Sequence, residues 1–484
     1  MSSATFKKVC AGLTLFITLY LVAYLYLFIT GSLFCFGEAV SYEGLLRVLN
    51  GLKFATSPTE IPLSLTPYTP VFLTPLIAIG KLLGITQIEH VSLMARIYQT
   101  GLLFVFFLFL NLIRERFFSN LSSRLSFLCV VLIVFFYSPT MELALRPDTL
   151  SFLCEAASLF YILRFLRYSA TRNLALASIF SGLAIALKLN TVGAAVGIIV
   201  FLILNKNLKN LIIYSLGLWI SALFFLGVQY LILGDILTTN IFQSIQSTIL
   251  SSGDAIKVYI KLFDLFLLPL SYYIFLVVYG VARLPQRKER TLFALVLSFS
   301  FLFAFVGQMK WGAFHNYFLG VLYLGLMPAS IAFTKITETK NTSQLIGSFL
   351  FYLFYITLLI IRGTSVPIKI WQDKNYFTEL KQLRLLLKEK TPQGLIYTNN
   401  EQLQLAFADR TAIGVLSQEL LETTPTLQKH IEPLKAKIKS LPLYSSYIIN
   451  CEAYESGKSS WTFINLEDFK KRTLIKTGRF CVFY

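Results

Sequence analysis

The sequence predicts an all-α polytopic membrane domain followed by a small soluble α/β domain. Hydrophobic residues make up 56% of the 484 positions and the mean hydropathy is +0.67, which is more apolar surface than a soluble domain can bury. Long apolar runs recur over residues 1–362, with lengths close to the roughly 20 residues that a bilayer crossing needs. From residue 363 onward, charged and alternating segments replace them.

The apolar runs predict about eleven transmembrane helices. They lie at residues 12–36, 93–113, 124–139, 149–163, 173–187, 191–204, 210–233, 258–281, 291–307, 317–334 and 343–361. The runs at 173–187 and 191–204 are short for a crossing. Residues 68–84 are a further candidate span, but Pro70 and Pro75 kink this run. We interpret it as a helix that lies at the outer membrane surface.

The positions of Lys and Arg predict the orientation, because basic residues that flank spans stay on the cytoplasmic side. They collect on alternate connections: Lys7, Lys8, Arg114, Arg116, Arg124, Arg164, Arg167, Arg172, Lys206, Lys209, Arg283, Arg287, Lys288 and Arg290. We therefore expect a multi-pass protein of the plasma (inner) membrane with a cytoplasmic N-terminus. Its first outer loop, with juxtamembrane helices, covers 37–92, and the chain leaves the membrane on the outer face near Gly363.

The tail, residues 363–484, is expected to be an extracytoplasmic α/β domain. Strands are predicted at Leu395–Thr398, Tyr447–Cys451 and within Leu474–Phe483, and a short helix at Glu401–Phe407. The tail holds 17 basic and 12 acidic residues, so most of the formal net charge of +18 lies in the membrane part. Cytoplasmic loops and anionic lipids explain that charge, and nucleic-acid binding is not expected.

Cys451 and Cys481 both lie in the tail, where an oxidising compartment permits a disulfide. The sequence leaves open whether they pair. No cysteine spacing typical of a zinc site occurs.

Polar and ionisable residues gather in four segments that the predicted topology brings to the outer face. Such groups are costly at membrane depth and mark a water-filled cavity or a functional site. The segments contain Glu38, Tyr42, Glu43, Arg47 and Lys53; Glu142, Arg146 and Asp148; Lys188 and Asn190; and Lys310, His315 and Asn316. Because the four segments are expected on the same side of the membrane, they predict a single extracytoplasmic site.

Several short motifs in these segments resemble those of the GT-C superfamily of membrane glycosyltransferases, which use polyprenyl-phosphate-linked sugars. That group includes the protein O-mannosyltransferases and the aminoarabinose transferase of lipid A. Gly37–Tyr42 resembles an acidic Asp-Glu-x-x-Tyr motif that opens the first outer loop. Arg47–Gly51 resembles the end of the following amphipathic helix, and Tyr68-Thr69-Pro70 the Tyr-x-Pro before a surface helix.

Later segments extend this resemblance over nearly the whole chain, in order and spacing. Arg146-Pro147-Asp148 resembles the second acidic motif, Gly182–Lys188 a Gly-Leu-x(3)-Thr-Lys segment, and Gly312–Tyr317 a Gly-x-x-x-Asn-Tyr segment. In the tail, Leu395–Asn400 and Ala408-Asp409-Arg410 are similar to the small soluble domain that ends many such proteins. Gly37 departs from the pattern, because the family has an Asp there, so Glu38 is the one carboxylate of this motif.

The resemblance implies transfer of a hexose or pentose from a polyprenyl-phosphate donor to a hydroxyl of a glycan, lipid or protein acceptor, with inversion. Such transfer needs a base for the acceptor proton, and a partly dehydrated carboxylate suits that role. Glu38 is the candidate base, with Glu43 as its fallback. Cations that contact the leaving phosphate would stabilise the transition state, and Arg146, Lys188 and Lys310 are the candidates.

Asp148 is the expected companion of Glu38 in catalysis: it would orient the acceptor, pair with Arg146, or join Glu38 in holding a divalent cation. No cofactor other than such a cation is expected. Tyr42, Tyr68, His315 and Asn316 are the candidate substrate-binding residues. These four come from the matching motifs.

Each of these residues also has a structural interpretation that involves no catalysis or substrate binding. Glu38 suits a solvated loop, and Asp148, directly before Thr149 and an apolar run, suits a helix N-cap. Arg146 and Lys188 at span ends suit contact with lipid phosphates. A lone histidine such as His315 is more often a structural hydrogen-bonding group. Glu155 and Asp264, inside apolar spans, could line a lipid cavity or pair with cations at helix ends.

Two other classes of function compete with a glycosyltransferase. A secondary transporter, or a lipid or sugar flippase, would carry ionisable groups near the bilayer midplane and often shows repeated halves. Here the polar groups lie on one face, the first outer loop is long, and the sequence shows no such repeat. A non-catalytic membrane scaffold whose tail binds a partner is the third hypothesis.

Overall fold

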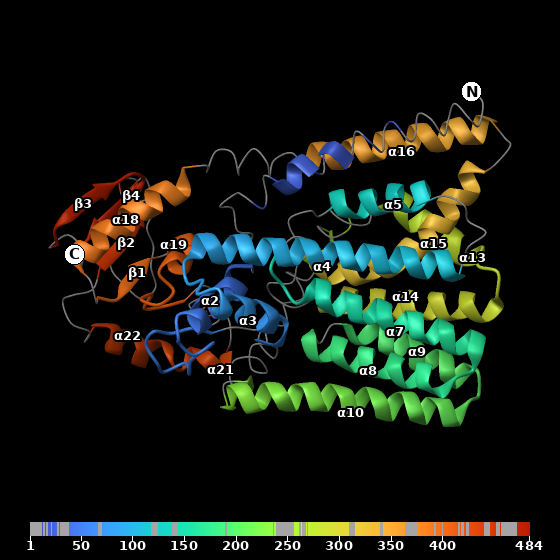
Figure 1. Ribbon diagram of the computed structural model, residues 1–484, viewed down its shortest axis with the longest axis horizontal. Helices are drawn as coiled ribbons and strands as arrows, with labels where there is room; N and C mark the ends of the chain where they lie inside the picture. The colour runs from blue at the N-terminus through green and yellow to red at the C-terminus, as the bar shows by residue number, and fades with distance from the viewer. Residues whose placement is uncertain are drawn as a thin grey trace.

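The computed structural model describes most of the chain from residue 38 to residue 484. The described residues are scattered positions within 12–29, then 38–65, 70–117, 124–137, 144–188, 191–235, 237–238, 256–260, 263, 268, 270–308, 315–338, 342–363, 375–391, 394–398, 400–414, 417, 421–422, 425–439, 446–451, 455 and 472–484. Figure 1 shows a bundle of helices at one end of the molecule, a small sheet at the other, and the short helices α2 and α3 between them.

The bundle consists of helices that coincide closely with the expected spans. They are α4 (Ile88–Phe117), α5 (Arg124–Tyr137), α7 (Asp148–Tyr168), α8 (Thr171–Leu187), α9 (Val192–Leu204), α10 (Leu208–Leu233), α13 (Ser271–Ala282), α14 (Arg287–Gly307), α15 (Leu319–Thr337) and α16 (Thr342–Gly363). Within the described residues, five helices are long and apolar enough to cross a membrane, and five apolar helices are shorter. The expected span at 258–281 coincides with α13 in its second half.

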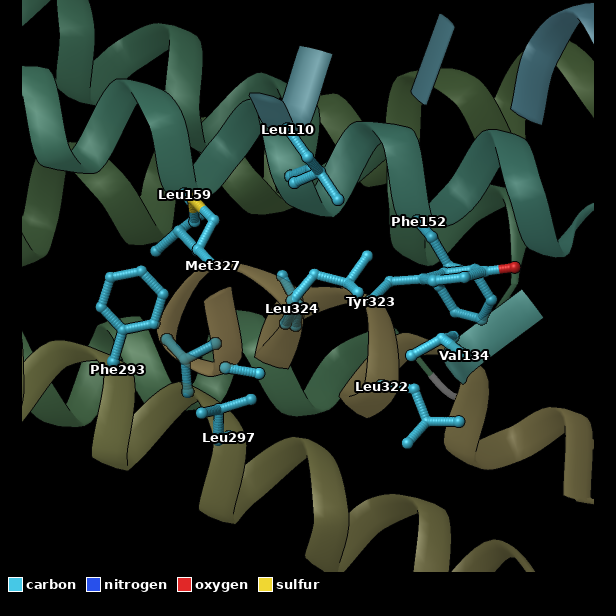
Figure 2. Packing of buried hydrophobic residues seen from close by; sticks show 14 of the residues in the cluster. Leu110, Val134, Phe152, Leu159, Phe293, Leu297, Leu322, Tyr323, Leu324 and Met327 are labelled. Atoms are coloured by element: carbon cyan, nitrogen blue, oxygen red, sulfur yellow. The ribbon is translucent and has the colours of Figure 1, made fainter. Parts of the chain in front are cut away.

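Helix α15 forms the centre of the bundle, with 83% of its most apolar window buried. Figure 2 shows Tyr323 and Met327 of α15 among side chains from α4, α5, α7 and α14. Helix α13 crosses α15 closely, because a Cβ on Gly280 would lie 1.8 Å from the backbone oxygen of Pro328. By contrast, α10 packs against α8 at the edge and exposes large apolar side chains such as Trp219 and Phe224, as expected of a helix that contacts lipid.

Helices α2 (Glu38–Leu49), η1 (Pro70–Leu73) and α3 (Thr74–Leu82) belong to the first outer loop. Gly80 of α3 lies against Leu49 of α2, since a Cβ there would be 2.7 Å from the Leu49 side chain. Helix α3 has nine residues and is too short to cross a bilayer, which agrees with a juxtamembrane helix at 68–84.

The C-terminal part forms a four-stranded sheet in the order β1-β2-β4-β3. Strands β1 (Ile396–Thr398) and β2 (Ser446–Asn450) pair in parallel, whereas β4 (Phe480–Phe483) pairs antiparallel with β2 and with β3 (Leu474–Thr477). The expected strands lie at these positions, and the short helix expected after β1 is α19 (Glu401–Ala406). The predicted fold class, a helical membrane domain with a small C-terminal α/β part, is confirmed.

Alternate residues of the strands bury both faces of the sheet. Ile448 and Val482 pack in one apolar cluster with α18 (Tyr376–Lys390), and this cluster continues into α2, α3 and α4. Ile449 and Phe483 pack in a second cluster with residues near α21 (Pro425–Gln428) and in α22 (Ile431–Lys439). A continuous core therefore joins the C-terminal part to the short helices of the first outer loop.

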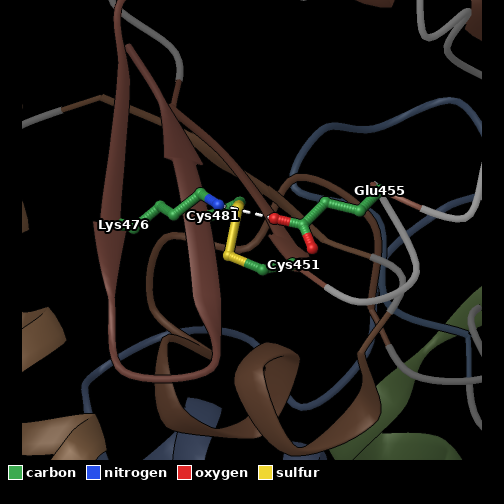
Figure 3. The surroundings of a disulfide bond; sticks show 4 residues. All are labelled: Cys451, Glu455, Lys476 and Cys481. Atoms are coloured by element: carbon green, nitrogen blue, oxygen red, sulfur yellow. Dashed lines mark hydrogen bonds and ion pairs between the residues drawn. A yellow bond between two sulfur atoms is a disulfide. The ribbon is translucent and has the colours of Figure 1, made fainter.

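Backbone hydrogen bonds also cross this junction, and a disulfide lies within the C-terminal part. The first outer loop pairs with the C-terminal part, because the Leu63 N–H donates to Ala412 O (2.8 Å) and the Gly414 N–H donates to Leu63 O (2.6 Å). Within the C-terminal part, Cys451 and Cys481 form a disulfide beside the ion pair of Lys476 and Glu455 (Figure 3). The pairing that the sequence left open is therefore present in the structure.

Candidate functional site

Glu38 is the first residue of α2, and its side chain is completely buried. Its Oε1 accepts a hydrogen bond of 3.1 Å from the backbone N–H of Leu145, in the segment that leads into α7. The free N–H groups of a helix N-terminus favour a negative charge at this position. The carboxylate therefore lies where α2 meets the start of α7, rather than in a solvated loop.

Tyr42 lies one turn after Glu38 on α2 and is also buried. Burial raises the pKa of its hydroxyl, and the charge of Glu38 acts in the same direction. The charge of Arg96 and hydrogen bonding to Arg96 and Ser92 oppose that rise in pKa. These contacts place two α4 side chains against the polar face of α2.

Arg96 and its neighbour Gln99 are site residues that the sequence analysis missed. Arg96 is fully buried near the start of α4. One turn later, the Gln99 Nε2 donates to Thr149 Oγ1 of α7 at 2.5 Å. A detectable signal existed, because a charged residue inside the apolar run at 93–113 is costly and indicates a functional or paired group.

Asp148 and Lys188 form an ion pair between two helices of the bundle. Asp148 is the first residue of α7, and Lys188 directly follows the last residue of α8. The N-cap position of α7 belongs to Pro147, so Asp148 does not act as the N-cap. The Lys188 Nζ also lies 5.3 Å from the ring centroid of Tyr317, a residue of the segment that connects α14 to α15.

Two further charged side chains interact with Lys188. The positive charge of Arg146 is close enough to disfavour the charged ammonium of Lys188. The charge of Glu155, two turns after Asp148 on α7, favours that ammonium. The Glu155 carboxylate faces Gly320 of α15, where a Cβ would lie 3.3 Å from Oε2. Both alternatives for Glu155, a lipid cavity and pairing with a cation at a helix end, stay predictions. Asp264 lies outside the described residues.

Together these contacts join Glu38, Tyr42, Arg146, Asp148 and Lys188 at one end of the bundle. The segment that binds Glu38 through Leu145 continues directly into Arg146 and Asp148. Two of the five belong to α2, Arg146 and Asp148 lie at the start of α7, and Lys188 directly follows α8; Arg96 and Gln99 of α4 and Tyr317 of η5 (His315–Phe318) contact this group. The five residues, which come from three of the polar segments, therefore lie close together, whereas the membrane side that they face stays a prediction.

Glu43 lies apart from this cluster. Its side chain is buried against the C-terminal part, where a Cβ on Gly414 would lie 1.9 Å from Glu43 Oε1. The charge of Glu43 acts on Arg47, whose Nε donates to Lys53 O at 2.9 Å. The structure gives Glu43 a place at the domain junction.

The remaining candidate residues lie wholly or partly outside the part of the chain that the structure describes. Tyr68 and Lys310 lie outside the described residues, as do Glu142 and Asn190. The backbone of His315 and Asn316 belongs to η5, next to Tyr317, but their side chains lie outside the described part. Their roles in substrate and phosphate binding stay predictions.

No group of three or more His, Cys, Asp or Glu is arranged to hold a metal ion among the described residues. Lys188 occupies the position beside Asp148 that a cation would take. The shared cation site suggested for Glu38 and Asp148 stays a prediction.

The fold and the cluster define a polytopic helical membrane protein whose buried charges gather at one end of the bundle. The family model described as dolichyl-phosphate-mannose-protein mannosyltransferase matches residues 70–230. No curated protein matches the chain.

Two solved structures share its fold over nearly its whole length. One is ArnT from Cupriavidus metallidurans bound to undecaprenyl phosphate, with a TM-score of 0.64 and 11% identity, covering 98% of each chain. The other is ArnT from the same organism in the apo state, with a TM-score of 0.63 and 12% identity, covering 100% of this chain and 98% of that one. These matches confirm the expected resemblance as a shared fold, with a sequence match to the mannosyltransferase model over residues 70–230.

Proposed function

We propose that the protein is a membrane glycosyltransferase that moves a sugar from a polyprenyl-phosphate donor to an acceptor hydroxyl. The observation that carries the proposal is the buried Glu38 carboxylate, hydrogen-bonded to the segment that leads to the Asp148–Lys188 pair. The match to the mannosyltransferase family model and the similarity to ArnT bound to undecaprenyl phosphate support this donor class. The sugar is a hexose or a pentose.

In the proposed step, Glu38 takes the proton of the acceptor hydroxyl while the oxygen of that hydroxyl attacks the anomeric carbon of the sugar. The bond from that carbon to the phosphate oxygen breaks, and its electron pair leaves with the polyprenyl phosphate. A single displacement inverts the anomeric centre. Because negative charge grows on the leaving phosphate, Lys188 and Arg146 stabilise the transition state more than the ground state.

Asp148 keeps Lys188 in position before the donor binds. The ion pair compensates the burial of both charges, which would otherwise be costly. When the donor phosphate arrives, it becomes a second anionic partner for Lys188. This role makes Asp148 a positioning residue and explains why a carboxylate and a cation lie together where the phosphate would bind.

We also propose that the site and the C-terminal part lie on the extracytoplasmic face, with the N-terminus in the cytoplasm. The alternation of basic connections supports this orientation. The disulfide of Cys451 and Cys481 supports it independently, because disulfides persist in oxidising compartments. Labelling of single cysteines introduced at the exposed Thr59 and at Ser138 and Ser459 in intact cells tests it: protection of all three from an impermeant reagent would refute the orientation.

The test of the activity is sugar transfer by the purified protein. Wild type, Glu38→Gln and Asp148→Asn are incubated with undecaprenyl- and dolichyl-phosphate sugars, and release of the lipid phosphate is measured. We expect turnover by the wild type and a reduction of about 10²–10⁴ in Glu38→Gln, the usual size of a general-base contribution. Full activity in both variants, or no turnover with any donor, would contradict the proposal. A transporter would instead move the donor across vesicles without breaking it.

A further inference from the structure

A cavity of about 220 Å³ lies between the first outer loop and the C-terminal part. Leu46 and Asn50 at the end of α2 form part of its wall, and Gln87, just before α4, forms another. Arg384 of α18 and the turn that holds Asp409 and Arg410 complete the lining. Its volume equals that of about seven water molecules in the liquid, which is enough for one sugar ring.

The two guanidinium groups of the cavity already have strong partners. Arg384 donates two hydrogen bonds to the carboxylate of Glu89, at 2.6 and 2.9 Å. Arg410 donates to the backbone oxygens of Gly394 and Thr391. Their donors are therefore largely used within the protein, and the carboxylate of Asp409 repels anions. A phosphate or another anionic group does not suit this cavity.

Other polar groups of the cavity remain available. Gln87 and Asp409 are exposed, and their side chains make no hydrogen bond among the described residues. An amide both donates and accepts, and a carboxylate accepts two or more hydrogen bonds. A small cavity lined by an amide and a carboxylate beside apolar side chains such as Leu46 suits a neutral ligand rich in hydroxyl groups.

The cavity is separate from the cluster at Glu38 but is built on the same helix. Leu46 is eight residues after Glu38, which is about 12 Å along α2 at 1.5 Å per residue. That separation suits a chain of several sugar units rather than one. We propose that the cavity is an acceptor subsite that binds one neutral sugar unit of an extended glycan, away from the unit that receives the new sugar.

This inference rests on the proposed transfer function, and its experiment separates the two. The full-length protein in nanodiscs is titrated with cellotetraose, maltotetraose and α-mannotetraose, and with inorganic phosphate, and binding is followed by saturation-transfer NMR. The test variants are Gln87→Trp, which fills the cavity, and Asp409→Ala. Lys381→Trp is the matched control, because Lys381 is exposed on α18 outside the cavity lining.

We expect at least one tetrasaccharide to bind to the wild type and to Lys381→Trp, with a Kd about tenfold or more higher in both test variants. Equal binding in Gln87→Trp, binding of phosphate alone, or no tetrasaccharide binding would overturn the subsite. Glu38→Gln should retain saccharide binding while losing transfer. If the wild type transfers sugar from no donor while Gln87→Trp still loses saccharide binding, the proposed function fails and the subsite stands.

Discussion

The start and the middle of helix α2 each bury a carboxylate, and the two carboxylates have different surroundings. At the N-terminal end, Glu38 and Tyr42 face α4 and the start of α7, next to the Asp148–Lys188 pair. Toward the C-terminal end, Glu43 and Arg47 face the loop at Lys53 and Gly414 of the C-terminal part. Both carboxylates are buried, so burial by itself does not distinguish a catalytic acid from a structural one.

The difference lies in the partners of each charge. Glu38 belongs to a group of ionisable residues supplied by separate helices, and in the proposed function this group meets the donor phosphate. Glu43 and Arg47 are four residues apart on one helix and interact locally. Burial lowers the pKa of Arg47 and the charge of Glu43 raises it, so each group helps to keep the other ionised. We therefore propose a catalytic role for Glu38. For Glu43 and Arg47 we propose a structural role at the junction with the C-terminal part.

The strongest test of this contrast replaces each carboxylate by its amide. Glu38→Gln should lower kcat about 10²–10⁴-fold without changing thermal stability much, because the proton acceptor is lost and the shape is kept. Glu43→Gln should keep kcat within about threefold and lower the melting temperature. Initial rates and thermal unfolding of both purified variants provide the comparison. Equal losses of kcat in the two variants would abolish the distinction.

The two cations provide a second comparison with a smaller expected effect. Lys188→Met should lower kcat/KM about 10²-fold, comparable to removing one donor that stabilises transition-state charge. Arg47→Met should act mainly on stability, since its guanidinium contacts protein groups at the junction. Because Lys188→Met removes the ammonium group that pairs with Asp148, unfolding must be measured alongside. Recovery of rate in Lys188→Arg would show that the positive charge matters.

The smallest effect on activity is expected at Gly414. A methyl group there would overlap Glu43 Oε1, so Gly414→Ala should destabilise the junction by about 1–3 kcal/mol through overpacking. Combining it with Glu43→Ala should restore most of that loss, because the overlapping carboxylate is removed. Urea unfolding of the single and double variants measures this coupling. Additive losses would mean that the two residues do not interact.

Much of the architecture could be predicted from the sequence because it depends on local patterns. Apolar run lengths located the ends of α8, α9 and α14 within a few residues, since a span is fixed by its hydrophobic length. Alternation located β1, β2 and strand structure within Leu474–Phe483, which the structure divides into β3 and β4. The fold class follows from these signals, because each element must bury its own apolar surface.

The candidate site was predictable only in part. Motif residues such as Glu38, Asp148 and Lys188 were recognisable, and their common side followed from the topology. Arg96 and Gln99 were missed, because their sequence neighbours look like an ordinary apolar span. Glu43 was kept as an alternative to Glu38, since five residues along the chain do not reveal which face of α2 meets which neighbour.

The class of the protein, the positions of its spans and strands, and a small set of candidate residues were thus readable in the amino-acid order. Which charges interact became visible in three dimensions: Glu38 contacts the Leu145 segment, Asp148 pairs with Lys188, and Glu43 contacts the C-terminal part. The pairing of Cys451 and Cys481 also became visible there. The physical reason is that apolar burial is encoded in local periodicity, whereas ion pairs and disulfides join residues far apart in the chain and depend on how helices and strands pack.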